Sequence, residues 1–178
     1  MDLTLKKIAD LATFTKLFGS AVHSLDHLEL RDNYAIDYEG VLWKRWLDAG
    51  KSTRLEAEPS PYWDLTTATT TRGVTMRRAR VFSTPPTDYT RLLHALGHQG
   101  AEHGETLRWL PRDLASDLRL PGNDFWLVDS ERVMFNVFDG EGRPTGAQFT
   151  DDPTVIELCA DAFEAVWSRA TPHETYQI

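Results

Sequence analysis

Two apolar runs, 124-DFWLVD-129 and 132-RVMFNVFD-139, are separated by only Ser130 and Glu131. Both runs are rich in aromatic and β-branched residues, which is typical of strands. Such a short connection joins antiparallel neighbours in a hairpin, which fixes how this part of the chain can fold. The Gly-rich turn DGEGR follows and leads into a third extended segment at 145–150, so the sequence predicts a three-stranded meander.

The rest of the chain alternates between helical and extended patterns. Apolar spacing, prolines and glycines predict helices over 3–18, 37–49, 62–72 and 87–99, and a last helix that Asp151-Asp152-Pro153 opens. Helical turns are expected at 22–25 and 113–118, and extended segments at 28–31, 74–83 and 107–111. We therefore predict an α/β fold with a mixed sheet flanked by helices, in one domain over 1–178, with a mainly helical N-terminal extension (1–72) and an α/β core (73–171).

Composition narrows the class of protein. The chain is 41% hydrophobic, which is typical of a globular domain, and its apolar runs fall far short of the ~20 residues that span a membrane. The single cysteine, Cys159, fits a reducing compartment, so we expect a cytoplasmic protein without a membrane partner. The net charge of −8 repels a phosphate backbone and predicts no direct nucleic-acid binding.

Motifs that would carry chemistry are absent from the sequence. It has no G-x-S-x-G elbow, Walker loop or G-x-G-x-x-G fingerprint. His23 with His27 and His94 with His98 are spaced four apart, but a third metal ligand would have to come from His103, Glu102 or Glu105 in a loop. Cys159 lies in the expected apolar stripe of the last helix. We therefore predict no catalytic residue, no metal and no cofactor.

Arginines and carboxylates near the expected strand ends form the candidate binding set. The residues that could line a ligand or partner site are Arg80, Asp88, Tyr89, Arg108, Arg112, Asp124, Trp126 and Asp129. The alternative is that the arginines, including Arg77 and Arg78, pair with Asp88, Asp113, Asp124 or Asp129, because a buried guanidinium needs a partner. The excess of acidic residues favours this pairing, and a core position is the expected outcome for Trp126.

The chain as a whole resembles a family of small, uncharacterised actinobacterial proteins that are often encoded beside XRE-type helix-turn-helix regulators. The resemblance covers nearly the full length and is carried by 28-LELRDNY-34, 73-GVTMRRARVFSTPPTDYTR-91, 107-LRWLPR-112 and 124-DFWLVDSERVMFNVFDGEGRPTGAQFTDDP-153. It implies a regulatory or accessory role and no established reaction.

The order of strands and helices from RRARVFS to FEAVWSRATP is also similar to half of a phospholipase D-type domain. In active members of that family, the strand before the hairpin carries His-x-Lys-x-x-x-x-Asp, in which the His is the nucleophile and the Lys holds phosphate. With the final Asp placed on Asp129, Asp124 takes the Lys position and Gly122 the His position. The resemblance therefore implies the fold without the chemistry, and a homodimer, since such halves usually pair.

Two functions remain open from the sequence. The first is a non-enzymatic module that binds a protein partner, possibly the XRE-type regulator. The second is a small-ligand sensor or enzyme with a strand-end pocket rich in Arg and Asp, lined by Arg80, Asp88, Tyr89, Arg112 and Asp124. Direct DNA binding would need a concentrated basic face.

Overall fold

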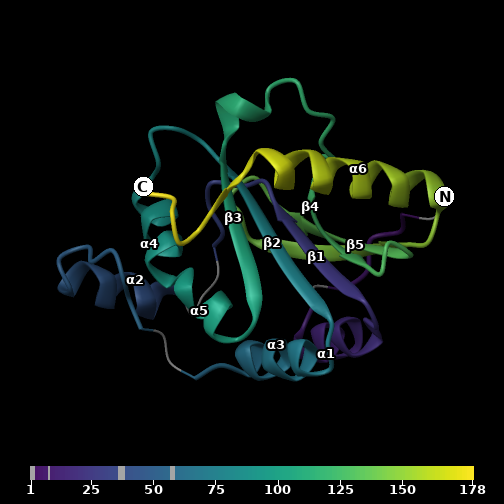
Figure 1. The fold of residues 1–178 in the computed structure, drawn as a ribbon, viewed down its shortest axis with the longest axis horizontal. Helices are drawn as coiled ribbons and strands as arrows, with labels where there is room; N and C mark the ends of the chain where they lie inside the picture. Colours follow the sequence, from purple (N-terminus) through teal and green to yellow (C-terminus); the bar gives the residue numbers. More distant parts are fainter. Residues whose placement is uncertain (1–2, 8, 36–38, 57–58) are drawn as a thin grey trace.

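The computed structural model describes residues 3–7, 9–35, 39–56 and 59–178. Within these ranges, one seven-stranded mixed sheet has the order β6-β5-β4-β1-β2-β3-β7 (Figure 1). The strands are β1 (Ser24–Glu29), β2 (Thr75–Phe82), β3 (Glu105–Pro111), β4 (Asp124–Val128), β5 (Arg132–Phe138), β6 (Pro144–Thr150) and β7 (Thr171–Pro172). β1, β2 and β3 are parallel, and the other pairs are antiparallel.

Helices cover both faces of this sheet. They are α1 (Leu11–Ser20), α2 (Glu39–Asp48), α3 (Pro61–Thr71), α4 (Asp88–Leu96), α5 (His98–Glu102) and α6 (Pro153–Arg169), with a 3₁₀ turn at Arg112–Ala115. Figure 1 shows α6 lying across one face, whereas α1 and α3 lie at the far end of the strands and α2, α4 and α5 lie beside β3. Among the described helices, none has the length and apolar content to cross a membrane. The predicted fold class is confirmed.

The long helix α6 forms where its sequence pattern predicts. The carboxylate of Asp152 caps it by accepting the Thr154 N–H at 2.9 Å, and Pro153 takes a position where a missing N–H costs nothing. Apolar side chains at three- and four-residue spacing then face the sheet: Val155, Cys159, Ala162, Phe163 and Val166. Their partners on that face are Leu28, Ala79, Val81, Leu110, Phe125, Leu127, Val133 and Phe135. This cluster is the main core.

The predicted meander of β4, β5 and β6 is confirmed, but its first corner shifts by one residue. The left-handed backbone falls at Asp129 (φ 51°) and Ser130 (φ 55°) rather than at the expected Ser130-Glu131. The Glu131 N–H donates to the Val128 carbonyl at 2.9 Å, which makes Asp129 and Ser130 the central residues of the turn. Aspartate tolerates this conformation better than most residues.

The first two expected elements are wrong in detail. The helix predicted over 3–18 begins only at Leu11, because Asp10 caps it by accepting the Thr13 N–H at 2.9 Å. Before it, the Lys6 N–H donates to the Ala147 carbonyl at 2.8 Å, so this segment pairs with the outer edge of β6. Ile8, part of the expected stripe, lies outside the described residues.

The expected helical turn at 22–25 and extended segment at 28–31 are replaced by β1. This strand lies between β4 and β2, so the N-terminal part is not an extension but supplies the middle of the sheet. The polar side chains of this strand are not typical of a buried strand, so the sequence did not predict it. Asp26, His27 and Glu29 are only 3%, 6% and 6% exposed, and arginines of β2 compensate the burial of the two carboxylates.

The remaining helices need smaller corrections. α3 begins at Pro61 and ends at Thr71, one residue before each predicted bound, whereas the expected start of α2 at Asp37 lies outside the described residues. The helix predicted over 87–99 is divided at Gly97, so Gly100 does not end it. Gly97 allows close packing, because an added Cβ would lie 2.7 Å from His173 Cε1 and 2.9 Å from Leu107 Cδ2. This break brings α5 next to the C-terminal segment.

Candidate functional site

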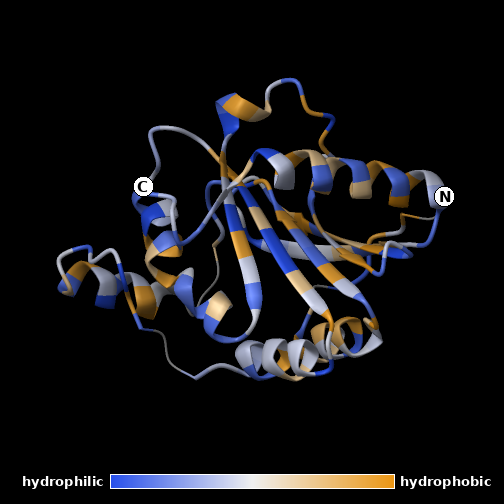
Figure 2. Cartoon of the chain, viewed as in Figure 1, coloured by the Kyte–Doolittle hydropathy of each residue, from blue (hydrophilic) through white to orange (hydrophobic). Residues whose placement is uncertain are grey.

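Charged side chains occupy the middle of the sheet on the face away from α6. Because side chains alternate along a strand, the neighbours of Leu28, Ala79 and Val81 point to this opposite face. Figure 2 shows hydrophilic stretches interrupting the central strands. We call Glu29, Arg78, Arg80 and Glu105 the charged network. Arg78 is 9% exposed and Glu105 is 3% exposed, so the network is part of the interior.

The charged network satisfies its own charges. The Arg78 guanidinium forms ion pairs with Glu29 and, at 3.0 Å, with Glu105, and it donates to the Tyr62 hydroxyl. Arg80 pairs with the other oxygen of Glu29. Two guanidinium groups thus face two carboxylates in a buried setting. An incoming phosphate would have to displace a carboxylate, which is unfavourable in a low-dielectric site.

His27 lies beside this network as a neutral ring. It stacks on Trp126 with centroids 3.8 Å apart, and its Nδ1 lies 3.4 Å from Glu29 Oε1. Burial, together with the charges of Arg78 and Arg80, holds the pKa of His27 well below its usual value. Neither ring nitrogen forms a hydrogen bond with the described residues.

Asp124 lies at the start of β4 and is also internally bonded. One carboxylate oxygen accepts the Leu30 N–H at 2.9 Å, and the other accepts the Tyr34 hydroxyl. Burial raises the pKa of Asp124 to about 6, because desolvation penalises the charged form more than these donors favour it. This carboxylate therefore holds the segment after β1 against β4.

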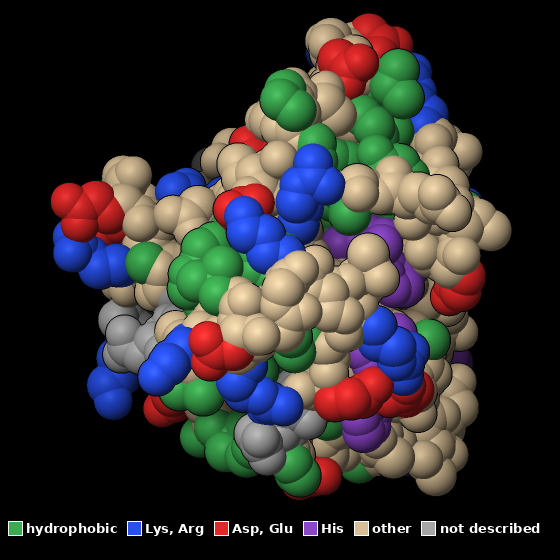
Figure 3. Space-filling model, turned by 90° about the vertical axis from the view of Figure 1, so that its left-hand side faces the viewer, with side chains coloured by type: hydrophobic (Ala, Val, Ile, Leu, Met, Phe, Trp, Pro, Cys, Tyr) green, Lys and Arg blue, Asp and Glu red, His purple; other side chains and the backbone are tan. Residues whose placement is uncertain are grey.

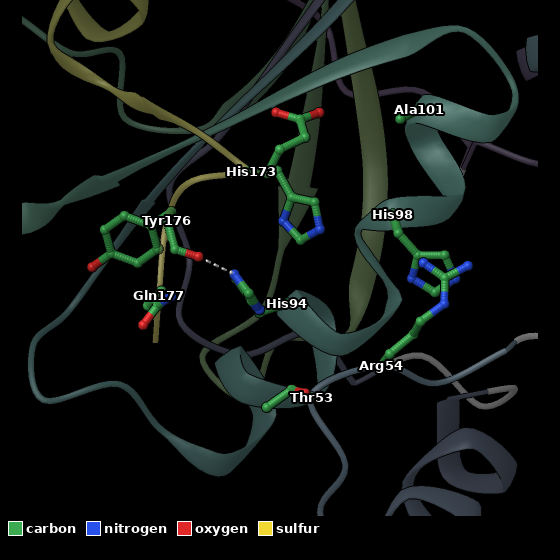
Figure 4. A pocket seen from close by; sticks show the side chains of 9 residues that line it. Thr53, Arg54, His94, His98, Ala101, His173, Tyr176 and Gln177 are labelled. Carbon is green, nitrogen blue, oxygen red and sulfur yellow. Dashed lines mark hydrogen bonds between the residues drawn. The ribbon is translucent and has the colours of Figure 1, made fainter.

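A pocket of about 400 Å³ opens on another part of the molecule, between α4, α5 and the segment after β7. Figure 3 shows histidine side chains gathered in a hollow of this face, with basic and acidic groups beside them. The lining residues, all drawn in Figure 4, are Thr53, Arg54, His94, His98, Ala101, His173, Glu174, Tyr176 and Gln177.

Hydrogen bonds orient the ring of each histidine of this pocket. His94 Nε2 donates to the Tyr176 carbonyl at 3.0 Å, and His98 Nδ1 donates to the Ala95 carbonyl at 3.1 Å while its Nε2 lies 3.5 Å from Glu56 Oε2. His173 Nδ1 accepts the Trp109 indole N–H at 3.1 Å, so its proton is on Nε2. Burial lowers the pKa of His94 and lowers that of His173 to about 4. Both rings are neutral near pH 7.

Residues 12–178 match the family described as "Domain of unknown function (DUF6879)". The chain belongs to this family. The sequence of this DUF6879 chain matches no protein of curated function.

Solved structures resemble the DUF6879 fold at low sequence identity. Nuc from Salmonella typhimurium, a phospholipase D family member, is 11% identical over 94% of this chain and 90% of Nuc, with a TM-score of 0.51. TrmBL2, described as an archaeal chromatin protein with a novel mode of DNA binding, is 16% identical over 96% of this chain and 55% of TrmBL2, with a TM-score of 0.52. NucT from Helicobacter pylori is 10% identical over 91% of this chain and 89% of NucT, with a TM-score of 0.49. The likeness to Nuc shows a fold of the phospholipase D type.

The DUF6879 chain brings only part of the expected binding set together. Near the ends of β1 and β2, Tyr34 contacts both Asp124 and Tyr89, with 6.3 Å between the two tyrosine ring centroids. Arg112 Nη2 donates to the Leu30 carbonyl at 2.5 Å. Arg80 belongs to the charged network nearby. These groups form a bonded cluster rather than the exposed row of free side chains that a strand-end pocket needs.

The other expected residues lie elsewhere. Asp88 pairs with Lys51 at 2.6 Å on the surface, and Arg108 lies on the α6 face, 4.4 Å from the ring centroid of Trp167. Asp129 lies at the opposite end of β4, where it accepts the N–H groups of Val22, His23 and Ser24 at 2.9, 2.7 and 2.7 Å. Burial opposes ionisation there, but the three amides lower the pKa of Asp129.

The favoured alternative, in which the arginines pair with carboxylates, is confirmed, but the carboxylates are not the expected ones. Arg77 binds Asp26 through two nitrogens at 2.7 and 2.8 Å, and Arg112 lies 3.7 Å from Asp32. The expected partners Asp88, Asp124 and Asp129 bind other groups. Trp126 is a core residue, 2% exposed, as expected.

Sequence reasoning missed the pocket of the DUF6879 chain. His23 and His27 do not share a helix, since His27 is on β1, and His94 and His98 fall on two different helices. Their spacing still pointed to this region of the chain. His173 and Tyr176 come from the C-terminal segment, whose position depends on the pairing of β7 with β3. No local pattern in the sequence predicts that contact.

Proposed function

We propose that this chain is a non-enzymatic regulatory or accessory protein of the cytoplasm, acting through a protein partner. Asp124 carries the proposal. Where the resemblance to phospholipase D-type domains requires a phosphate-binding lysine, the chain has a buried carboxylate that accepts donors from Leu30 and Tyr34. Gly122 takes the position of the nucleophilic histidine and offers no side chain. The nearby arginines are already neutralised by carboxylates.

The partner we propose is an XRE-type helix-turn-helix regulator encoded beside the gene in actinobacteria. The net charge of −8 disfavours direct contact with DNA, so an effect on DNA would pass through such a partner. The likeness to TrmBL2, described as a chromatin protein with a novel mode of DNA binding, supports a role for this fold in a protein that acts close to DNA. We also propose a homodimer, by analogy with paired phospholipase D-type halves.

Two measurements test this function. Co-expression with the neighbouring regulator should give a complex on size exclusion, and light scattering of the free protein should give the mass of two 20.2-kDa chains. A regulator from an unlinked gene is the control. Separate, monodisperse peaks at micromolar concentration would argue against the partner. Hydrolysis of bis(p-nitrophenyl) phosphate that is lost on Asp124→Asn would argue against a non-enzymatic role.

The histidine-lined pocket supports a second candidate, a small-ligand sensor. Its volume of about 400 Å³ falls within the range of ligand sites in proteins. It lies beside α5 rather than at the strand ends, where the sequence placed it. A ligand that changes the NMR chemical shifts of the His98 and His173 rings would support this second function. A ligand screen that leaves these chemical shifts unchanged would count against it.

A further inference from the structure

One cluster outside the charged network combines a histidine with two carboxylates. Glu56 lies in the segment before α3, and His98 and Glu102 lie one turn apart on α5, so they share a face of that helix. One ligand atom from each of the three residues lies within 4.8 Å of the others. We call Glu56, His98 and Glu102 the triad.

The orientation of His98 is the central observation. Its Nδ1–H donates to the Ala95 carbonyl at 3.1 Å, so Nε2 is the ring nitrogen that faces the two carboxylates. That nitrogen lies 3.5 Å from Glu56 Oε2 and 3.9 Å from Glu102 Oε1. Two carboxylates that converge on one ring nitrogen need a cation between them, either a proton in the hydrogen bond from Nε2 to Glu56 Oε2 or a metal ion. A histidine fixed through a backbone carbonyl, with its other nitrogen turned toward carboxylates, is also the usual arrangement around a bound metal ion.

The spacing of the triad fits a small metal ion. Bonds of about 2.0–2.2 Å to nitrogen and oxygen, at tetrahedral angles, hold ligand atoms roughly 3.3–3.6 Å apart. The observed separations of 3.5 and 3.9 Å need only a small inward movement of the Glu102 side chain. That carboxylate is half exposed, at 50%, so no core packing opposes this movement, and its contact with Arg54 is the one that has to adjust.

Arg54 orients the carboxylates from outside the triad. Its Nε lies 2.9 Å from Glu56 Oε1, so the other oxygen, Oε2, is left facing His98. Its Nη2 also lies 2.8 Å from Glu102 Oε1, the oxygen nearest to His98. A metal ion would compete with Arg54 for that oxygen, which favours modest rather than tight affinity.

We propose that Glu56, His98 and Glu102 bind a divalent first-row transition metal ion such as Zn²⁺, at the rim of the histidine-lined pocket. Imidazole and carboxylate are both ordinary zinc ligands, and three protein ligands leave a fourth position for water or a small molecule. His98 and Arg54 belong both to this rim and to the lining of the pocket, so an occupied site would add a positive charge to the pocket wall. This inference does not depend on the proposed partner.

The alternative occupant of the gap is a proton. His98 would then be an imidazolium that forms ion pairs with both carboxylates, and added zinc would have to displace that proton in order to bind. The two cases differ in their response to metal, not in fold.

The test is a titration of the full, tag-free chain with zinc chloride by calorimetry, together with cobalt(II) absorption spectra. We expect one ion per chain and a visible d–d band that zinc removes. His98→Gln and Glu102→Gln should each weaken binding roughly tenfold or more, the lower limit known even for residues that only support metal ligands. His23→Gln, an exposed histidine far from the triad, is the matched control and should leave affinity unchanged.

Two results would overturn the proposal. One is absence of binding up to millimolar zinc. The other is equal affinity of the wild type and His98→Gln, which would place the ion elsewhere. Circular dichroism and urea midpoints of all variants establish that any loss of binding is not a loss of fold.

Discussion

Arg78→Met tests whether the charged network is a compensated unit of the core. The substitution removes the guanidinium from between Glu29 and Glu105. Glu29 keeps Arg80 as a partner, but Glu105 loses its ion pair while only 3% exposed. Leaving one carboxylate buried without its partner costs about 3–5 kcal/mol. That is a large share of the roughly 5–15 kcal/mol that stabilises a typical domain.

The double variant separates this penalty from lost packing. Arg78→Met with Glu105→Leu removes both charges, so it should recover about 0.5–3 kcal/mol of coupling relative to the sum of the two single variants. Urea unfolding followed by tryptophan fluorescence measures the free energy of unfolding of each variant. Trp126 reports on this region, because the Arg78 guanidinium lies 5.6 Å from its ring centroid. Arg169→Met, which breaks a surface ion pair with Asp117, is the control and should leave the midpoint unchanged. Additive losses, or a loss near that of the control, would refute the reasoning.

Three further predictions concern single side chains. Burial gives Asp124 a pKa of about 6, against 3.8 in the unfolded chain, so the native state binds this proton more tightly. The free energy of unfolding should therefore fall by about 3 kcal/mol as the pH rises from below the unfolded-state pKa to above the native-state pKa. Asp124→Asn should flatten this part of the urea–pH profile, and an unchanged slope would contradict the assignment. Asp129→Ala removes the acceptor of three N–H groups, so it should lower the free energy of unfolding by about 1–3 kcal/mol in the same assay. Asp129→Asn keeps one oxygen acceptor and should lower it by less. Equal losses in the two variants would show that the carboxylate oxygens do not matter. Cys159 is fully buried with its pKa raised to about 12, so Ellman's reagent should label it only in urea; rapid labelling of the native protein would contradict this burial.

Elements with local signals were predictable from the sequence. The Asp152-Pro153 cap and the apolar stripe gave α6, and two apolar runs around a short corner gave the hairpin. The core position expected for Trp126 is also confirmed, since this residue is 2% exposed and His27 stacks on it. In these cases, the residues that determine the structure are neighbours in the chain.

Features that depend on distant partners could not be read from the sequence. β1 carries Asp26 and Glu29 in the interior, and only the arginines of β2, about fifty residues later, make that burial favourable. The pocket likewise needs His173 to return beside α5. From local patterns alone, charged residues are expected on the surface. For this reason the sequence predicts a helical turn and a short extended segment in place of the central strand β1.

The two borders of the sheet bear on how this protein meets its partners. Lys6 binds Ala147 along the outer side of β6, and β7 with the His173 N–H, 3.0 Å from the Leu107 carbonyl, covers the outer side of β3. Main-chain groups at these points are already occupied from within the chain, so a neighbour cannot extend the sheet there by adding a strand. The protein partner that we propose would therefore contact side chains on helices and loops rather than these main-chain groups.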